Sequence, residues 1–152
     1  MPSLNKDLLH CIIEEVFNGN RTGLIPVLYA PECEGFSPDG PFLGPEGFRQ
    51  ALEKYRLAFP DFRLHTNCLI AEDDRIVVHY TFVGTHTGSL AGIAPTGMRM
   101  RIPGVMISRI ENNRVVEQSF VWDNLGPRRQ VWLASIAERM IAAADQKLPA
   151  VA

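Results

Sequence analysis

Cysteine is scarce in this sequence, which argues against disulfide-rich proteins and cysteine-ligated zinc proteins. The chain has 152 residues and three cysteines, which lie far apart at Cys11, Cys33 and Cys68. An odd, scattered set fits neither a disulfide framework nor a zinc site, and it suits a reducing compartment. We therefore expect a cytoplasmic protein.

Long apolar runs and an excess of basic charge are also missing. No hydrophobic stretch approaches the roughly 20 residues needed to cross a bilayer, and the N-terminus lacks the basic and apolar regions of a signal peptide. The formal net charge is −2, so there is no basic surplus to hold a polyanion. We expect neither a membrane nor a nucleic acid as a partner.

Motifs for common cofactors and nucleophiles are absent as well. The glycines between residues 84 and 104 are too scattered for a phosphate loop, and no histidines pair with carboxylates at metal-ligand spacing. No serine, histidine and aspartate have the spacing expected of a hydrolase triad. We expect no metal and no bound cofactor.

What is present is enough for one ordinary domain, which we expect to span residues 1–152. Hydrophobic residues make up 46% of the chain, so a substantial core can form. Apolar residues recur at helical spacing over Asn5–Phe17 and Pro45–Phe59, and a short helix is predicted over Thr22–Tyr29. Residues 30–44 are rich in proline and glycine and are predicted to be loop.

From residue 62 the pattern changes to the two-residue period of strands. Strands are predicted over residues 62–71, 75–86, 98–110 and 114–123. Pro103-Gly104 predicts a bulge or bend, and a final helix is predicted from Pro127 to about Lys147. Helices, then strands joined by hairpins, then a helix favour an α+β fold with an antiparallel-rich sheet packed against helices. If that sheet curls, its concave side encloses a pocket.

Two polar residues at strand ends are candidates for chemistry. Asp123 follows an otherwise apolar strand, and His86 ends another strand. A carboxyl group that is partly buried without a cation can exchange protons near neutral pH. We therefore consider Asp123 a candidate general acid/base and His86 its candidate polar helper. A helix cap is the alternative role for Asp123, and a loop histidine bonded to the backbone is the alternative for His86.

Apolar and aromatic side chains near these residues are candidate walls of a substrate pocket. Those that share strand parity with His86 or Asp123 are Tyr80, Phe82, Ser119 and Val121. The remaining candidates are Phe17, Phe36, Phe59, Met106 and Trp122. A planar aromatic ligand would favour such walls, and plain core packing is the alternative for each.

Several short motifs occur in a characteristic order. They are Gly44-Pro45-Glu46-Gly47-Phe48-Arg49, Ala58-Phe59-Pro60-Asp61, Gly84-Thr85-His86-Thr87-Gly88, Pro95-Thr96-Gly97, Ser108-Arg109-Ile110 and Trp122-Asp123-Asn124-Leu125-Gly126. Together, from about Leu24 to Gln130, they resemble the SnoaL-like polyketide cyclases of the nuclear-transport-factor-2-like superfamily. The resemblance implies a cone-shaped α+β barrel. A curved mixed β-sheet would wrap around N-terminal helices, with an apolar cavity open at one end and a C-terminal helix.

The resemblance also implies an activity. Members that cyclise aromatic polyketides use an aspartate that matches Asp123 as general acid/base, and His86 matches a histidine of the family. A cofactor-free, aldol-type ring closure of a hydrophobic polyketide-derived substrate is therefore expected, by a homodimer or higher homo-oligomer. Hydroxylase-like relatives, epoxide hydrolases and binding-only proteins of the same fold stay open. The chain departs from the family at Ser119, where a tryptophan is frequent, so the substrate is undefined.

Overall fold

Residues 2–28 are mostly helical, where the apolar spacing predicts helices. The computed structural model describes residues 2–123 and 125–146. The first helix, α1 (Pro2–Cys11), continues into a π-helical segment, η1 (Ile12–Asn18), and the short turn η2 (Thr22–Leu24) leads into α2 (Ile25–Leu28). The stripe Leu9, Ile12, Ile13 and Val16 is fully buried, because these positions fall on one face of the helix.

The remaining elements are the six strands of the sheet and two long helices. They are β1 (Tyr29–Ser37), β2 (Gly40–Leu43), α3 (Gly44–Ala58), β3 (Arg63–Glu72), β4 (Arg75–Thr85), β5 (Arg99–Glu111), β6 (Arg114–Trp122) and α4 (Leu125–Asp145). The predicted helix at Pro45 and the four predicted strands after residue 62 are confirmed within a few residues.

Residues 30–44 are not loop, and that prediction is wrong. They form most of β1 and all of β2, which pair as a hairpin through the turn Pro38-Asp39. Gly40, which opens β2, has φ +124°. Strand β1 then pairs in parallel with β6, far away in the sequence. Pro41 is tolerated because β2 is an edge strand, and Pro31 lies where the pairing of β1 with β6 shifts register. The composition could not reveal a strand whose partner lies at the other end of the chain.

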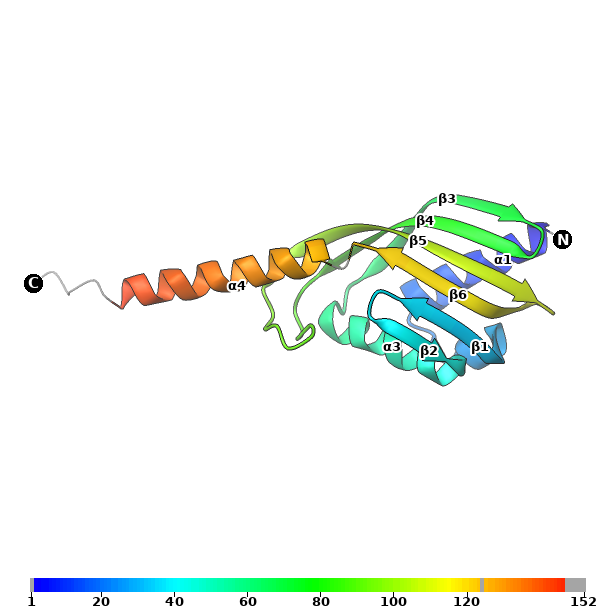
Figure 1. The fold of residues 1–152 in the computed structure, drawn as a ribbon, viewed down its shortest axis with the longest axis horizontal. Coiled ribbons are helices and arrows are strands. Elements are labelled where there is room, and N and C mark those ends of the chain that lie inside the picture. The colour runs from blue at the N-terminus through cyan, green and yellow to red at the C-terminus, as the bar shows by residue number, and fades with distance from the viewer. Residues whose placement is uncertain (1, 124, 147–152) are drawn as a thin grey trace, which may run out of the picture.

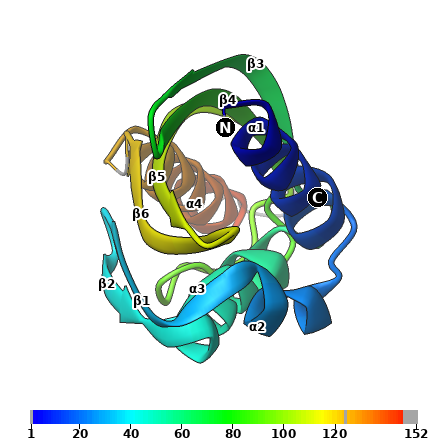
Figure 2. The same ribbon diagram turned by 90° about the vertical axis from the view of Figure 1, so that its right-hand side faces the viewer.

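The six strands form one mixed sheet in the order β2-β1-β6-β5-β4-β3. All neighbouring pairs are antiparallel except β1 and β6. Seen end-on, the sheet curls around the interior without closing, and α1 and α3 cover its open side (Figure 2). The predicted α+β class, with a curved mixed sheet wrapped around N-terminal helices, is confirmed.

The predicted irregularity at Pro103-Gly104 is not a bulge. The pairing of β4 with β5 runs through Thr81↔Pro103 and Tyr80↔Gly104 without a shift. The register shift in β5 lies further on, between Arg109 and Ile110, where β5 meets β6. Gly104 therefore keeps its place in the ladder.

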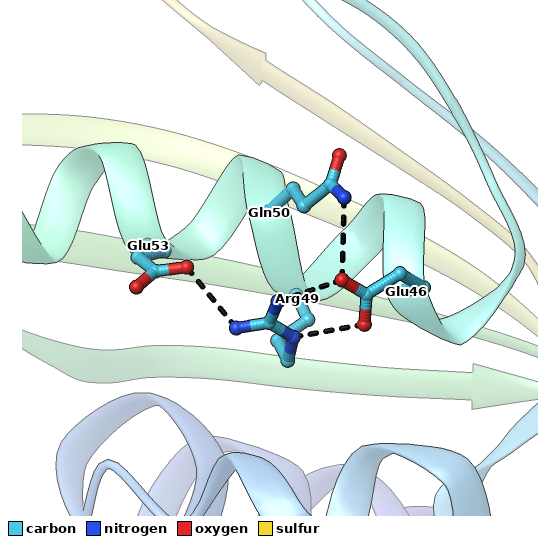
Figure 3. Close-up of polar contacts among 4 residues, drawn as sticks. All are labelled: Glu46, Arg49, Gln50 and Glu53. Carbon is cyan, nitrogen blue, oxygen red and sulfur yellow. Dashed lines mark hydrogen bonds and ion pairs between the residues drawn. The ribbon is translucent and has the colours of Figure 1, made fainter.

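Helix α3 has two contrasting faces, which fix how it lies on the sheet. Phe48 and Leu52 are buried, whereas Glu46, Arg49 and Glu53 form an exposed ion-pair network (Figure 3). The Arg49 guanidinium lowers the pKa of Glu46 to about 2. Charge on one face and aromatic side chains on the other direct the apolar face into the interior.

Helix α4 extends from the end of the sheet, away from the other elements (Figure 1). Trp132 and Met140, which the sequence places on one helical stripe, are 55% and 67% exposed. The predicted helix end near Lys147 lies outside the described residues. No helix in the part of the chain that the structure describes is long and apolar enough to span a membrane.

Candidate functional site

A cavity of about 110 Å³ lies between the concave face of the sheet and helix α3. Its walls are aromatic and aliphatic, and the polar side chains among them are uncharged. The lining residues are Phe17, Ser37, Phe42, Phe48, Ala51, Leu52, Tyr55, Phe59, Phe62, Leu64, Tyr80, Phe82, Leu90, Ile102, Phe120 and Trp122. Those that are only half-buried, including Tyr55, Leu90 and Trp122, mark where the cavity meets solvent.

The aromatic walls are arranged in contacting pairs. Phe48 and Phe120 are nearly parallel, with ring centroids 6.4 Å apart. On the other side, Phe82 contacts Phe59 and Phe62, both at 5.2 Å. Rings fixed in this way offer flat apolar surfaces to a ligand, and such surfaces favour a ligand that is itself flat.

Five of the residues predicted to line a pocket do line this cavity, namely Phe17, Phe59, Tyr80, Phe82 and Trp122. The other four lie elsewhere. Phe36 and Val121 are 57% and 59% exposed, and Met106 is fully buried in the core. Ser119 is half-buried and pairs with Ile107 of β5.

The face of strand β6 that points into the cavity is not the one that the sequence analysis predicted. Gln118 and Phe120 are buried, and Phe120 and Trp122 line the cavity, so Ser119 and Val121 lie on the outer face. The prediction assumed that Asp123 points inward and that every second residue before it does the same. Asp123 follows the end of the strand, so the alternation of side chains in β6 need not extend to it.

Helix α3 supplies lining residues that the sequence analysis placed on the apolar face of a predicted helix and did not consider for the pocket. Phe48, Leu52 and Tyr55 face the cavity, at the helical spacing that already identified the apolar face of α3. Tyr55 is the signal in the sequence that could have indicated a cavity. A hydroxyl on an apolar helix face needs a hydrogen-bond partner or water, so it is less expected in a fully packed core.

Asp123 does not line the cavity, and it lies next to a residue that does. It directly follows Trp122, which lines the mouth, and it is exposed. The Tyr55 ring packs edge-on against Trp122, with centroids 5.7 Å apart. The Tyr55 hydroxyl donates a hydrogen bond to the carboxylate of Asp39, which is also exposed. Two carboxylates therefore belong to the same stretch of rim, and the sequence analysis did not find Asp39, because it lies in the region predicted as loop.

His86 is buried and holds the segment after β4 against the sheet. Its Nδ1 atom lies 3.0 Å from Oγ1 of Thr96 and accepts a hydrogen bond from the Thr96 backbone N–H at 3.3 Å. Its backbone N–H donates to the carbonyl of Met98 at 2.9 Å, and its own carbonyl accepts from Gly97 at 2.8 Å. These bonds close residues 86–98 into a loop.

The imidazole of His86 is neutral and sits one layer behind the cavity wall. Burial lowers its pKa, although the nearby Gly88 backbone acts in the opposite direction. The ring centroid is 5.5 Å from that of Phe59, a lining residue, and His86 itself is not among the lining residues. The structure thus places His86 and Asp123 in different settings, one buried behind a wall and the other exposed at the rim.

Among the described residues, no group of three or more His, Cys, Asp or Glu side chains could hold a metal ion. The side chains in and beside the described cavity include phenols, carboxylates and apolar surfaces.

Comparisons with known proteins agree on the fold. AclR, a proposed hydroxylase from Streptomyces galilaeus, is 24% identical, covers 86% of this chain and 97% of its own, and has a TM-score of 0.76. A proposed SnoaL-like polyketide cyclase from Jannaschia sp. CCS1 is 17% identical, with coverages of 84% and 90% and a TM-score of 0.79. IdmH, a proposed polyketide cyclase from Streptomyces antibioticus, is 22% identical, with coverages of 80% and 93% and a TM-score of 0.71.

Because these solved structures are less than 25% identical to the chain, their likeness shows the fold alone. A comparison with curated protein sequences found no match. The family model described as SnoaL-like polyketide cyclase, however, matches residues 8–131, which is most of the sequence. The chain therefore belongs to the SnoaL-like polyketide cyclase family.

Proposed function

We propose that this protein binds a neutral, flat, hydrophobic molecule in its cavity and closes a ring in it by an aldol-type reaction, without a cofactor. The observation that supports this most is the juxtaposition of an uncharged aromatic cavity with carboxylates at its mouth. Asp123 follows Trp122 there, and Asp39 accepts a hydrogen bond from Tyr55. Membership of the cyclase family supports the same reaction class.

The proposed reaction needs one base and one acid. The Asp123 carboxylate removes a proton from the carbon next to one substrate carbonyl, and the resulting enolate carbon attacks a second carbonyl of the same molecule. A carbon–carbon bond forms, and the second carbonyl becomes an alkoxide. The protonated Asp123 then returns the proton to that alkoxide. General acid/base catalysis of this kind typically accelerates a step by about 10²–10⁴-fold.

The size of the cavity explains how a carboxylate at the rim can act. The cavity volume of about 110 Å³ is somewhat smaller than the roughly 150 Å³ of an engineered apolar cavity that binds benzene. The cavity therefore accepts about one ring. The rest of a larger substrate would lie in the mouth, beside Tyr55, Trp122 and Asp123.

Two alternatives of the same fold make different demands on the site. An epoxide hydrolase would need an Asp-Arg-Asp arrangement around a water, and none of the described lining residues is an aspartate or an arginine. A binding-only protein is favoured by one observation, the exposure of Asp123. Turnover separates that alternative from the cyclase proposal.

The test uses a neutral triketone that closes to a bicyclic ketol by an intramolecular aldol reaction, and the ketol then loses water to give an enone. Enone formation is followed by ultraviolet absorbance with the wild type, Asp123→Asn and the matched rim variant Asp39→Asn. We expect closure above the buffer rate, reduced at least about 100-fold by Asp123→Asn and less by Asp39→Asn. Closure that Asp123→Asn leaves unchanged would remove Asp123 from the mechanism, and no closure above buffer would favour a binding-only protein.

A further inference from the structure

Three residues form one row across the concave side of the sheet, next to the cavity. Tyr80 of β4 pairs with Gly104 of β5, and Gly104 pairs with Trp122 of β6. Tyr80 and Trp122 both line the cavity. The residue between them has no side chain, so the row has a notch at its centre.

The Tyr80 ring fills that notch. A Cβ atom added at Gly104 would lie 2.5 Å from both Cζ and the hydroxyl oxygen of Tyr80, far closer than van der Waals contact allows. The ring therefore leans over Gly104 towards β6, which brings its hydroxyl over the centre of the concave face. Any larger residue at position 104 would displace it.

The hydroxyl of Tyr80 has no partner among the described residues. The side chain is 4% exposed, and no described residue makes a hydrogen bond to its oxygen. Burial alone raises its pKa, so the group is a neutral O–H at physiological pH. The fully buried side-chain atoms that lack a partner among the described residues are Nε of Arg56 and Nε2 of His86, so the Tyr80 oxygen keeps some surface, which we place against the cavity that Tyr80 lines. A hydroxyl on an apolar cavity wall with no protein partner can bond a polar group of a ligand.

The other hydroxyls that line the cavity already donate their protons within the protein. Tyr55 donates to Asp39, and Ser37 donates to the carbonyl of Gly40 at 3.3 Å. The buried Tyr29, outside the cavity, donates to Oε1 of Gln118 at 2.8 Å. Tyr80 is thus the lining residue whose hydroxyl proton remains available to a ligand.

We propose that the Tyr80 hydroxyl donates a hydrogen bond to a carbonyl oxygen of a neutral ring compound, whose ring lies against the aromatic walls. The proposal rests on the cavity being the substrate site, as proposed above. Because no charged side chain lines the cavity among the described residues, a neutral acceptor is favoured over a carboxylate. In ring closure the same hydrogen bond would stabilise the enolate oxygen as it forms.

The test compares two probes of nearly the same shape, the bicyclic ketone indanone and its parent hydrocarbon indane. Their dissociation constants are measured by ligand-observed NMR titration with the full-length wild type, Tyr80→Phe and Tyr29→Phe. Tyr29→Phe is the matched control, since it removes a hydroxyl that already has a protein partner away from the cavity. Gly104→Ala is a second variant, which displaces the Tyr80 ring without changing that residue.

We expect Tyr80→Phe to weaken indanone binding about 3- to 10-fold, the effect of one neutral hydrogen bond, and to leave indane binding within about 2-fold. Gly104→Ala should also weaken indanone binding more than indane binding, whereas Tyr29→Phe should change neither. If both probes bind and Tyr80→Phe changes their affinities equally, the hydrogen bond is refuted. The proposed ring closure would survive that result, because it is judged by the Asp123→Asn assay. If the wild type binds neither probe, the ligand inference is overturned as well.

Discussion

The same substitution at two buried tyrosines should lower the free energy of unfolding at one position and not at the other. Tyr29 and Tyr80 are 0% and 4% exposed. The Tyr29 hydroxyl donates to Gln118, whose amide in turn donates to Oγ of Ser108 at 3.0 Å. The Tyr80 hydroxyl has no partner among the described residues. Replacing each by phenylalanine removes one oxygen atom and changes little else.

Tyr29→Phe should destabilise the fold. Oε1 of Gln118, which is 1% exposed, would lose its donor in a site that water does not reach. Leaving a buried acceptor unsatisfied costs about 1–3 kcal/mol. At about 2–4 °C per kcal/mol for a domain of this size, the melting temperature should fall by about 2–12 °C.

Tyr80→Phe should leave the free energy of unfolding unchanged or raise it by up to about 1 kcal/mol, because it removes an unpaired hydroxyl from an apolar wall. Urea unfolding followed by circular dichroism measures both variants, and an unchanged m-value confirms that each still folds in the same way. Equal losses of stability in the two variants would refute the reasoning, since they would mean that the Tyr80 hydroxyl is paired within the protein.

Two further predictions concern pH and assembly. Because the pKa of His86 is lowered in the folded state, the unfolded chain binds the proton first, so stability should fall as pH drops through about 6.5. His86→Gln should flatten that fall in urea titrations at several pH values, and an unchanged slope would contradict a buried neutral imidazole. We also predict a homodimer through the outer face of the sheet, where Ile107 and Val121 are 37% and 59% exposed. Val121→Lys should weaken it at least about 10-fold by light scattering after size exclusion, and a wild type that stays monomeric at high concentration would contradict the prediction.

Local pattern was sufficient for most of the fold. The helical spacing in α3 and the alternation in β4 each identify an element and its buried face, because both depend on residues close together in the sequence. The class of fold then follows from the order of these elements. Strand β1 was missed because its parallel partner, β6, lies near the other end of the chain, and local composition carries no trace of that pairing.

The site was harder to predict than the fold for the same reason. Tyr80 was a candidate from strand parity, but its relation to Gly104 depends on the register between β4 and β5. The hydrogen bond between Tyr55 and Asp39 joins a helix to a hairpin. The sequence motifs drew attention to His86 and Asp123, and whether a side chain lies behind the wall or at the rim is decided by tertiary packing.

The central claim is that a neutral carbonyl compound binds in the cavity while a rim carboxylate moves its proton. The most direct measurement is deuterium incorporation at the carbon next to the carbonyl of indanone, followed by proton NMR in heavy water. The account predicts exchange faster than in buffer, slowed at least about 100-fold by Asp123→Asn and several-fold by Tyr80→Phe. Exchange at the buffer rate with indanone bound, or equal rates for the wild type and Asp123→Asn, would contradict it.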